Sequence, residues 1–213
     1  MRQDVSQILT IAVLGATGAT GRHVISTALR RGHTVIALVR TPGLLEPASG
    51  LREVVWADLG DASTLIEAFR DADVVISVLG GAARGPTTVA TDGIRSAIAA
   101  MKRAGVPRLI VVSAHGIADS HNKSLYSLAV WAGVGDKMRD KETMEPLIVR
   151  SGLEWTIVRP PALKNNAETG RYTTGVDLPI RLWSSIGRAD LAGYLVREAE
   201  EPQFVHAFPR ITQ

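Results

Sequence analysis

The chain of 213 residues contains no cysteine. Disulfides, thiol catalysis and thiolate metal sites are therefore excluded, and this composition suits a reducing compartment. The five histidines show no ligand spacing such as HExxH, so we expect no metal site. No GxSxG motif is present to indicate a serine hydrolase.

Long apolar runs and runs of one charge are also missing. No stretch approaches the roughly 20 apolar residues that cross a bilayer, and the first residues, Met1-Arg2-Gln3-Asp4, do not follow a signal-peptide pattern. The net charge is only +3, and 21 acidic residues are interspersed among 24 basic ones. We therefore expect a cytoplasmic protein that binds neither membranes nor nucleic acid.

The length and composition are those of one folded domain. The hydrophobic fraction of 46% and the charged fraction of 21% are ordinary for a globular chain, which excludes a largely disordered one. A chain of this length fills one core and is short for two. We predict a single domain over 1–213, with a core at 8–163 and a C-terminal appendage at 164–213, acting as a monomer or a homodimer.

Strand and helix patterns alternate along the core. Short apolar runs rich in β-branched residues, joined by helical crossovers, predict an α/β fold with a doubly wound parallel sheet of order 3-2-1-4-5-6 and ligands at the carboxyl edge. In the appendage we expect one helix at 188–200 and a possible seventh, short strand at 204–208. The core strands are predicted at 8–14, 34–39, 53–57, 73–79, 108–113 and 154–158, and its helices at 20–31, 61–70, 87–104 and about 134–150.

The first strand runs directly into a GxxGxxG turn and then a helix. Gly15 permits the tight turn, Gly18 lets the backbone approach a pyrophosphate, and Gly21 lets the helix pack closely. The neighbouring residues are small, so free amides and the positive end of the helix can face an anion. The turn therefore predicts a dinucleotide site, to which Thr17, Ala19 and Thr20 also belong.

The residues after the second strand indicate which dinucleotide is preferred. NAD sites place an acidic residue there for the ribose hydroxyl, whereas NADP sites place a cation for the 2′-phosphate. This strand ends at Arg40, with Arg22 beside the last glycine, so we expect NADP(H) to be preferred over NAD(H); alternatively, Arg40 is a solvated surface residue.

Two further strand ends contribute expected cofactor contacts. Asp58 and Leu59 follow the third strand on the adenine side, although Asp58 can equally cap the next turn. After the fourth strand, Leu79, Gly80 and Gly81 allow close approach of the cofactor, or the glycines mark a loop.

These motifs, together with the segments VVSA, SGLEWTIVRPPAL and IGRADLA, resemble the atypical short-chain dehydrogenase/reductase family, in its NAD(P)-binding, NmrA-like and flavin (biliverdin) reductase-like members. The resemblance spans most of the chain. It implies a dinucleotide cofactor far more firmly than it implies a reaction, because one fold serves many functions. Members include flavin, biliverdin, quinone and isoflavone-type reductases and redox-sensing regulators.

The resemblance also implies site residues. The family's enzymes often use a serine on the fifth strand and a tyrosine four residues before a lysine; here Ser113, followed by Ala114, and Lys141 match, but Lys137 stands in place of the tyrosine. Lys141 is the expected ribose contact; alternatively, it forms a surface pair with Glu145, and Ser113 only caps its strand. The segment that wraps the nicotinamide in this family corresponds to Pro160, Pro161, Ala162 and Leu163.

Catalytic candidates are accordingly Ser113, His115 and Lys141. His115 lies at the carboxyl edge, and an imidazole is suited to donate a proton there. His121, Tyr126 and Trp131 precede the Lys141 helix and are substrate-wall candidates, although aromatic residues in such a segment also serve as core packing.

The missing tyrosine favours acceptors that need little acid catalysis. We expect an NADPH-dependent reductase that passes hydride to a small molecule such as a flavin, a quinone or a related conjugated carbonyl. The first alternative is a non-catalytic NADP(H)-binding redox sensor. A weaker alternative is an NAD(P)-dependent epimerase or dehydratase, for which about 50 residues after the sixth strand leave a cramped pocket.

Overall fold

The short apolar runs form one six-stranded parallel sheet, with the predicted order β3-β2-β1-β4-β5-β6. The computed structural model describes residues 7–81, 87–120 and 125–213, the side chains of 119 and 125–130 excepted. Strands with continuous apolar sequence belong inside a sheet that is covered on both faces. The strands are β1 (Thr10–Leu14), β2 (Thr34–Val39), β3 (Leu51–Val55), β4 (Val74–Ser77), β5 (Arg108–Val112) and β6 (Glu154–Val158).

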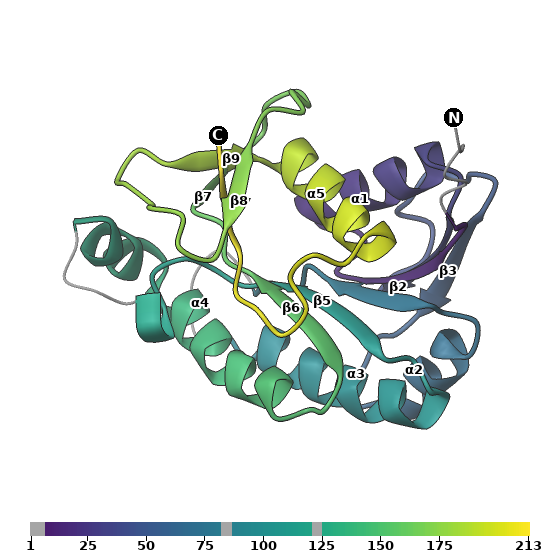
Figure 1. Cartoon of the computed structure of the whole chain (residues 1–213). Coiled ribbons are helices and arrows are strands. Elements are labelled where there is room, and N and C mark those ends of the chain that lie inside the picture. Colours follow the sequence, from purple (N-terminus) through teal and green to yellow (C-terminus); the bar gives the residue numbers. More distant parts are fainter. Residues whose placement is uncertain (1–6, 82–86, 121–124) are drawn as a thin grey trace.

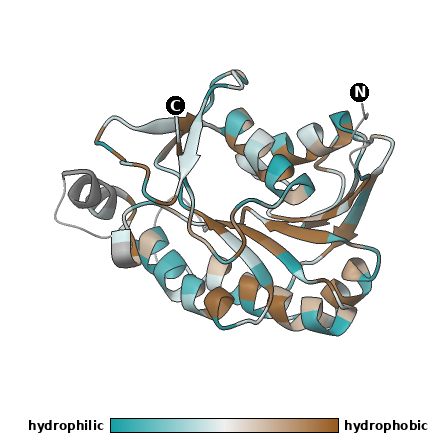
Figure 2. Ribbon diagram, viewed as in Figure 1, coloured by the Kyte–Doolittle hydropathy of each residue, from teal (hydrophilic) through white to brown (hydrophobic). Residues whose placement is uncertain are grey.

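Two layers of helices cover the sheet (Figure 1). Helices α1 (Ala19–Arg30) and α5 (Arg188–Glu200) pack on one face, while α2 (Ala62–Phe69), α3 (Val89–Ala104) and α4 (Leu125–Val149) pack on the other. Figure 2 shows the hydrophobic colour concentrated along the strands. Each face contributes its own apolar cluster, so the sheet is the centre of the core.

The helix ends follow from the local sequence. Asp61 caps α2 by accepting hydrogen bonds from the amides of Ser63 (3.0 Å) and Thr64 (3.3 Å), as its position in the sequence predicts. Gly32 and Gly105 follow α1 and α3 with φ of +85° and +79°, a conformation that glycine adopts without strain.

Several predicted bounds differ from those observed; β1 begins at Thr10, β4 covers only Val74–Ser77, and two further differences have an identifiable feature behind them. The third strand was expected at 53–57 but β3 ends at Val55, because the Trp56 ring turns into the core and its Nε1 donates to the Asp61 carbonyl (3.0 Å). The fourth helix was expected from about 134, whereas α4 begins at Leu125 and has non-helical backbone angles at Val134 (φ −140°).

The appendage also departs from expectation. Residues 204–208 do not form a strand; Ala207 makes only an isolated bridge to Thr156. Two small sheets form instead, and neither adds to the main sheet. They pair β7 (Ala162–Lys164) with β9 (Ser185–Gly187), and β8 (Thr173–Gly175) with β10 (Arg210–Thr212).

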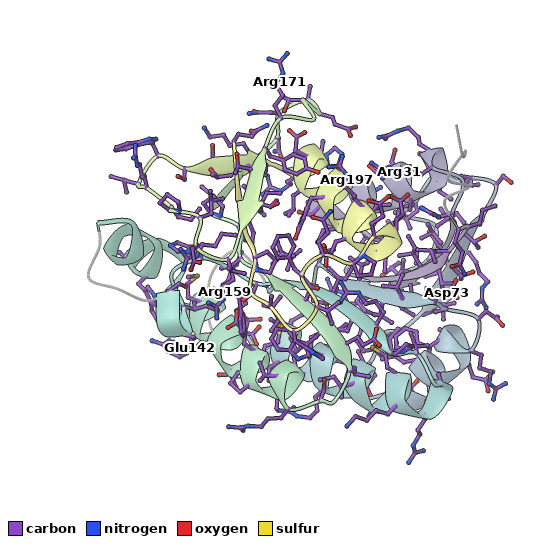
Figure 3. All side chains as sticks on the ribbon, viewed as in Figure 1. Arg31, Asp73, Glu142, Arg159, Arg171 and Arg197 are labelled. Carbon is purple, nitrogen blue, oxygen red and sulfur yellow. The ribbon has the colours of Figure 1, made fainter. Side chains whose placement is uncertain are left out.

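The carboxyl ends of the strands share one edge of the sheet. Figure 3 labels Asp73, just before β4, at one side of the view, and Arg159, just after β6, at the other. Because all six strands are parallel, their carboxyl ends lie on the Arg159 side, beneath β7 to β9 (Figure 1). In the described part of the chain, no helix has the length and apolar character to span a membrane.

Candidate functional site

The glycine turn between β1 and α1 is built too tightly for side chains. Gly15 has φ +82°, and a Cβ there would lie 3.0 Å from the carbonyl carbon and oxygen of Val78 at the end of β4. A Cβ on Gly21 would lie 2.2 Å from the Gly15 carbonyl oxygen and 2.7 Å from that of Ala16. The glycines therefore allow the first turn of α1 to sit directly against the strand end.

The N-terminal amides of α1 have no hydrogen-bond partners among the described residues. The first helical hydrogen bond of α1 runs from the Arg22 amide to the Gly18 carbonyl (3.0 Å), no side chain caps the helix, and its first turn contains no acid. Among the described residues, none accepts from the amides of 19–21. Free amides and the positive helix end make this position suited to bind an anion.

A cleft of about 570 Å³ opens in front of this turn. A hollow of this size suits a cofactor or a small-molecule ligand. Many of the predicted cofactor contacts line it, so residues from four separate strand ends meet here. The predicted residues that line it are Gly15, Thr17, Gly18, Arg40, Leu59, Leu79, Gly80 and Gly81.

Sequence reasoning missed part of the lining. Trp56 packs near Gly93 of α3, where a Cβ would lie 3.4 Å from the indole and 2.5 Å from Leu79. The only sequence signal for Trp56 was its place two residues before Asp58. The other unpredicted lining residues are Leu38, Val78, Thr87, Thr88 and Val89. Thr87 and Thr88 also border a smaller hollow of about 270 Å³ between α3 and α4.

Arginines stand at the rim of the cleft. Arg40 is exposed, and no described residue pairs with its guanidinium. Arg22 is exposed too, and its Nε donates to the Thr17 carbonyl (3.2 Å), which holds it beside the glycine turn. Asp58 is exposed and accepts from the Gly60 amide (2.8 Å), so its alternative role as a turn cap is realised.

Lys141 reaches the carboxyl edge from α4. Its ammonium donates to the carbonyl of Val112, the last residue of β5 (2.6 Å). It also donates to the carbonyl of Leu79, which follows β4 (3.4 Å). Burial is the main cause that lowers the pKa of Lys141 to about 8. The charges of Asp140 and Glu145 oppose this shift, and the charge of Lys137 adds to it. The alternative surface pair between Lys141 and Glu145 does not form, because the Glu145 carboxylate pairs with Arg159.

Two buried contacts fix α4 in place. Asp140 accepts from the amides of Ala90 and Thr91 (both 3.0 Å), so it caps the start of α3 from another helix. Glu145 forms a two-point ion pair with Arg159 after β6, with distances of 3.1 and 2.6 Å. Because Asp140 and Glu145 are engaged in these contacts, neither forms an ion pair with Lys141, whose ammonium is held at the carboxyl edge of the sheet by main-chain carbonyls.

The end of β5 places Ser113, Ala114 and His115 next to the segment after β6. Ser113 is buried, and its Oγ has no hydrogen-bond partner among the described residues. The His115 amide donates to the Pro160 carbonyl (2.9 Å), and the residue is only 6% exposed. Pro160 and Pro161 are buried, while Ala162 is exposed and Leu163 half-buried.

Of the three substrate-wall candidates, the structure describes the side chain of Trp131 alone. Trp131 donates from Nε1 to the Gly116 carbonyl (2.9 Å), which ties α4 to the loop after β5. Tyr126 lies in α4 but its side chain is outside the described part, and His121 is outside the described residues altogether. No group of three or more acidic or histidine side chains in the described ranges is placed to hold a metal ion.

Comparison with known proteins agrees with the geometry of the cleft. Residues 15–202 match a protein family described as NAD(P)H-binding. Among solved structures, ChuY from Escherichia coli O157:H7, described as an anaerobillin reductase, is 25% identical, with a TM-score of 0.79 over 95% of this chain and 96% of that one.

Curated relatives vary in length. YhfK of Bacillus subtilis, named an uncharacterized sugar epimerase, is 29% identical over 91% of this chain and 89% of its own length. The isoflavone reductase homolog IRL of Zea mays is 36% identical over 46% of this chain. The match spans only 33% of that relative.

Proposed function

Since the chain belongs to the NAD(P)H-binding family, with oxidoreductases among its neighbours, we propose that it is an NADPH-dependent reductase. Its acceptor is a flavin, a quinone or a related conjugated carbonyl. The observation that carries the proposal is the uncapped α1 terminus beside a cleft whose lining includes Arg40, a cation with no ion-pair partner among the described residues. NADPH, when bound, supplies the hydride.

The chain's own residues divide the work of binding. The amides of 19–21 hold the pyrophosphate, and Arg22 and Arg40 hold the 2′-phosphate. Trp56 and Leu59 pack beside the adenine, since they line the cleft after β3. Lys141 binds the ribose at the carboxyl edge, and the free Ser113 Oγ is the nearby polar group that can orient a ligand.

The direct test is to measure NADPH oxidation in the presence of flavins, quinones and enones. The loss of the absorbance of the reduced nicotinamide reports the rate. We expect at least one class to be reduced well above the rate without protein, and NADH to be the poorer donor. Failure with all three classes, in a protein that binds NADPH, would contradict the reductase proposal.

Lys137 favours a second candidate, a dinucleotide-dependent sensor. It occupies the position of the tyrosine that donates a proton in related enzymes, and the other candidate donor, His115, is buried. A sensor must distinguish NADPH from NADP⁺, so titration of the intrinsic tryptophan fluorescence with each separates the two proposals. Equal affinity without turnover would exclude both.

The lowered pKa of Lys141 predicts a pH dependence of cofactor binding. Because the pKa is about 8, the ammonium is charged at neutral pH and loses its proton at a pH where an ordinary lysine retains it. We expect the NADPH dissociation constant to rise about fivefold to tenfold between pH 7.5 and 9.5, as a charge-assisted hydrogen bond to the ribose weakens.

The matched variant is Lys141→Arg. Its guanidinium stays charged throughout that range, so the rise should disappear even where overall affinity is lower. An equal rise in wild type and variant, measured by fluorescence titration, would assign the titration to another group.

A further inference from the structure

Two half-buried lysines lie one helical turn apart on α4. Lys137 and Lys141 are four residues apart, so they are neighbours on one side of the helix. Helix α4 connects the parallel strands β5 and β6 and therefore runs against them. Since the Lys141 ammonium is level with the Val112 carbonyl, Lys137 lies one helical turn further out, beyond the carboxyl edge.

The acids of the same helix are all engaged elsewhere. No described residue pairs with the Lys137 ammonium, and Lys141 binds only main-chain carbonyls. Neither ammonium therefore has an ion-pair partner among the described residues. The acid pairs are Asp136 with Arg139 (3.1 Å), Asp140 with the amides of Ala90 and Thr91, Glu142 with the Ala118 amide (3.1 Å), and Glu145 with Arg159.

The phosphates of a bound dinucleotide do not neutralise these lysines. The pyrophosphate belongs at the glycine turn after β1, and the 2′-phosphate at Arg40 after β2. Lys137 and Lys141 belong instead to α4, the helix before β6, and neither is among the residues that line the cleft. The Lys141 ammonium contacts the chain at the ends of β4 and β5, on the carboxyl edge where the acceptor must meet the nicotinamide. Like charges four apart on a helix repel, so an anion between them is favoured.

We propose that the acceptor carries a fixed anionic group, a carboxylate or a phosphate, and that Lys137 binds it beside the ring that accepts hydride. This rests on the proposed reductase function. Lys137 is then a specificity residue: it replaces a proton-donating tyrosine with a cation that selects charged acceptors over neutral ones of the same ring system. Lys141 remains the ribose contact.

The test compares matched acceptors that differ only in charge. FMN against riboflavin tests a phosphate, and a quinone carboxylic acid against its methyl ester tests a carboxylate. We expect Lys137→Gln to raise KM for the anionic member of a pair about tenfold, the equivalent of one charged contact, while kcat and the neutral member's KM change less than about twofold. The pair that responds identifies the anion.

Lys102→Gln is the control. Lys102 is exposed in the last turn of α3, at the opposite edge of the sheet. The substitution therefore removes the same charge as Lys137→Gln, but far from the site. It should leave both pairs at wild-type values. Equal KM changes for charged and neutral acceptors in Lys137→Gln would overturn the proposal.

A binding measurement separates this inference from the reductase proposal. The complex with NADP⁺ is titrated with each member of both pairs, and tryptophan quenching gives the affinities without turnover. Tighter binding of an anionic member that is lost in Lys137→Gln supports the inference even where no acceptor is reduced. Turnover with no Lys137-dependent preference for charge overturns the inference and leaves the reductase proposal standing.

Discussion

Gly21→Ala is expected to weaken NADPH binding by at least about a hundredfold, because the glycine turn has no room for a methyl group. The new Cβ would meet the carbonyl oxygen of Gly15 at 2.2 Å and that of Ala16 at 2.7 Å. Both are main-chain atoms, so the clash is relieved only by moving α1 away from the end of β1. The free amides of the first helical turn would move with it. Titration of NADPH fluorescence measures the loss.

Two other glycine variants distinguish a damaged binding turn from a damaged fold. Gly18→Ala places its Cβ 3.2 Å from the Gly15 carbonyl oxygen, a smaller conflict, and we expect a loss of about tenfold with nearly unchanged thermal unfolding. Gly133→Ala in α4 meets nothing within 4 Å and should bind as wild type. Wild-type affinity in Gly21→Ala would refute the assignment of this turn to the dinucleotide.

The sheet order could be predicted because each strand is a short apolar run whose neighbours in sequence are helices. Few arrangements satisfy right-handed crossovers and two covered faces. Strand and helix limits were less predictable where a single side chain decides them, as Trp56 does by turning inward after Val55. The appendage was least predictable, because its strands have three residues each and pair over long sequence distances.

In the candidate site, too, features set by local sequence could be predicted and features set by long-range contacts could not. The glycine turn and Arg40 could be located because local backbone geometry and charge carry their signal. The contacts that position Lys141 could not be predicted from the sequence, because they join residues that are distant along the chain. Asp140 and Thr91 are 49 residues apart, and Glu145 and Arg159 lie on different elements that only the folded chain brings together. Sequence spacing alone suggested a pair between Lys141 and Glu145, whereas the buried arginine takes that carboxylate.

Reversing the charge of Arg40 tests the cofactor preference most directly. Arg40 follows β2 at the rim of the cleft, is exposed, and has no described ion-pair partner, so its charge is available to a ligand. A carboxylate at this position repels a 2′-phosphate and accepts a hydrogen bond from a 2′-hydroxyl. We expect Arg40→Glu to weaken NADPH binding about a hundredfold and to bind NADH as well as wild type or better.

The control for Arg40→Glu is the same change at Arg171, which extends into solvent from the loop before β8 (Figure 3). Both variants alter the net charge equally, so a general electrostatic effect would weaken NADPH binding in both. A local 2′-phosphate site weakens it only in Arg40→Glu, and the difference should shrink at high salt because an exposed pair is screened. Arg22 would retain part of the attraction, so the double variant Arg22→Ala, Arg40→Glu should favour NADH further. If Arg40→Glu binds NADPH as tightly as wild type, Arg40 is a solvated surface residue and the preference for NADPH loses its physical basis.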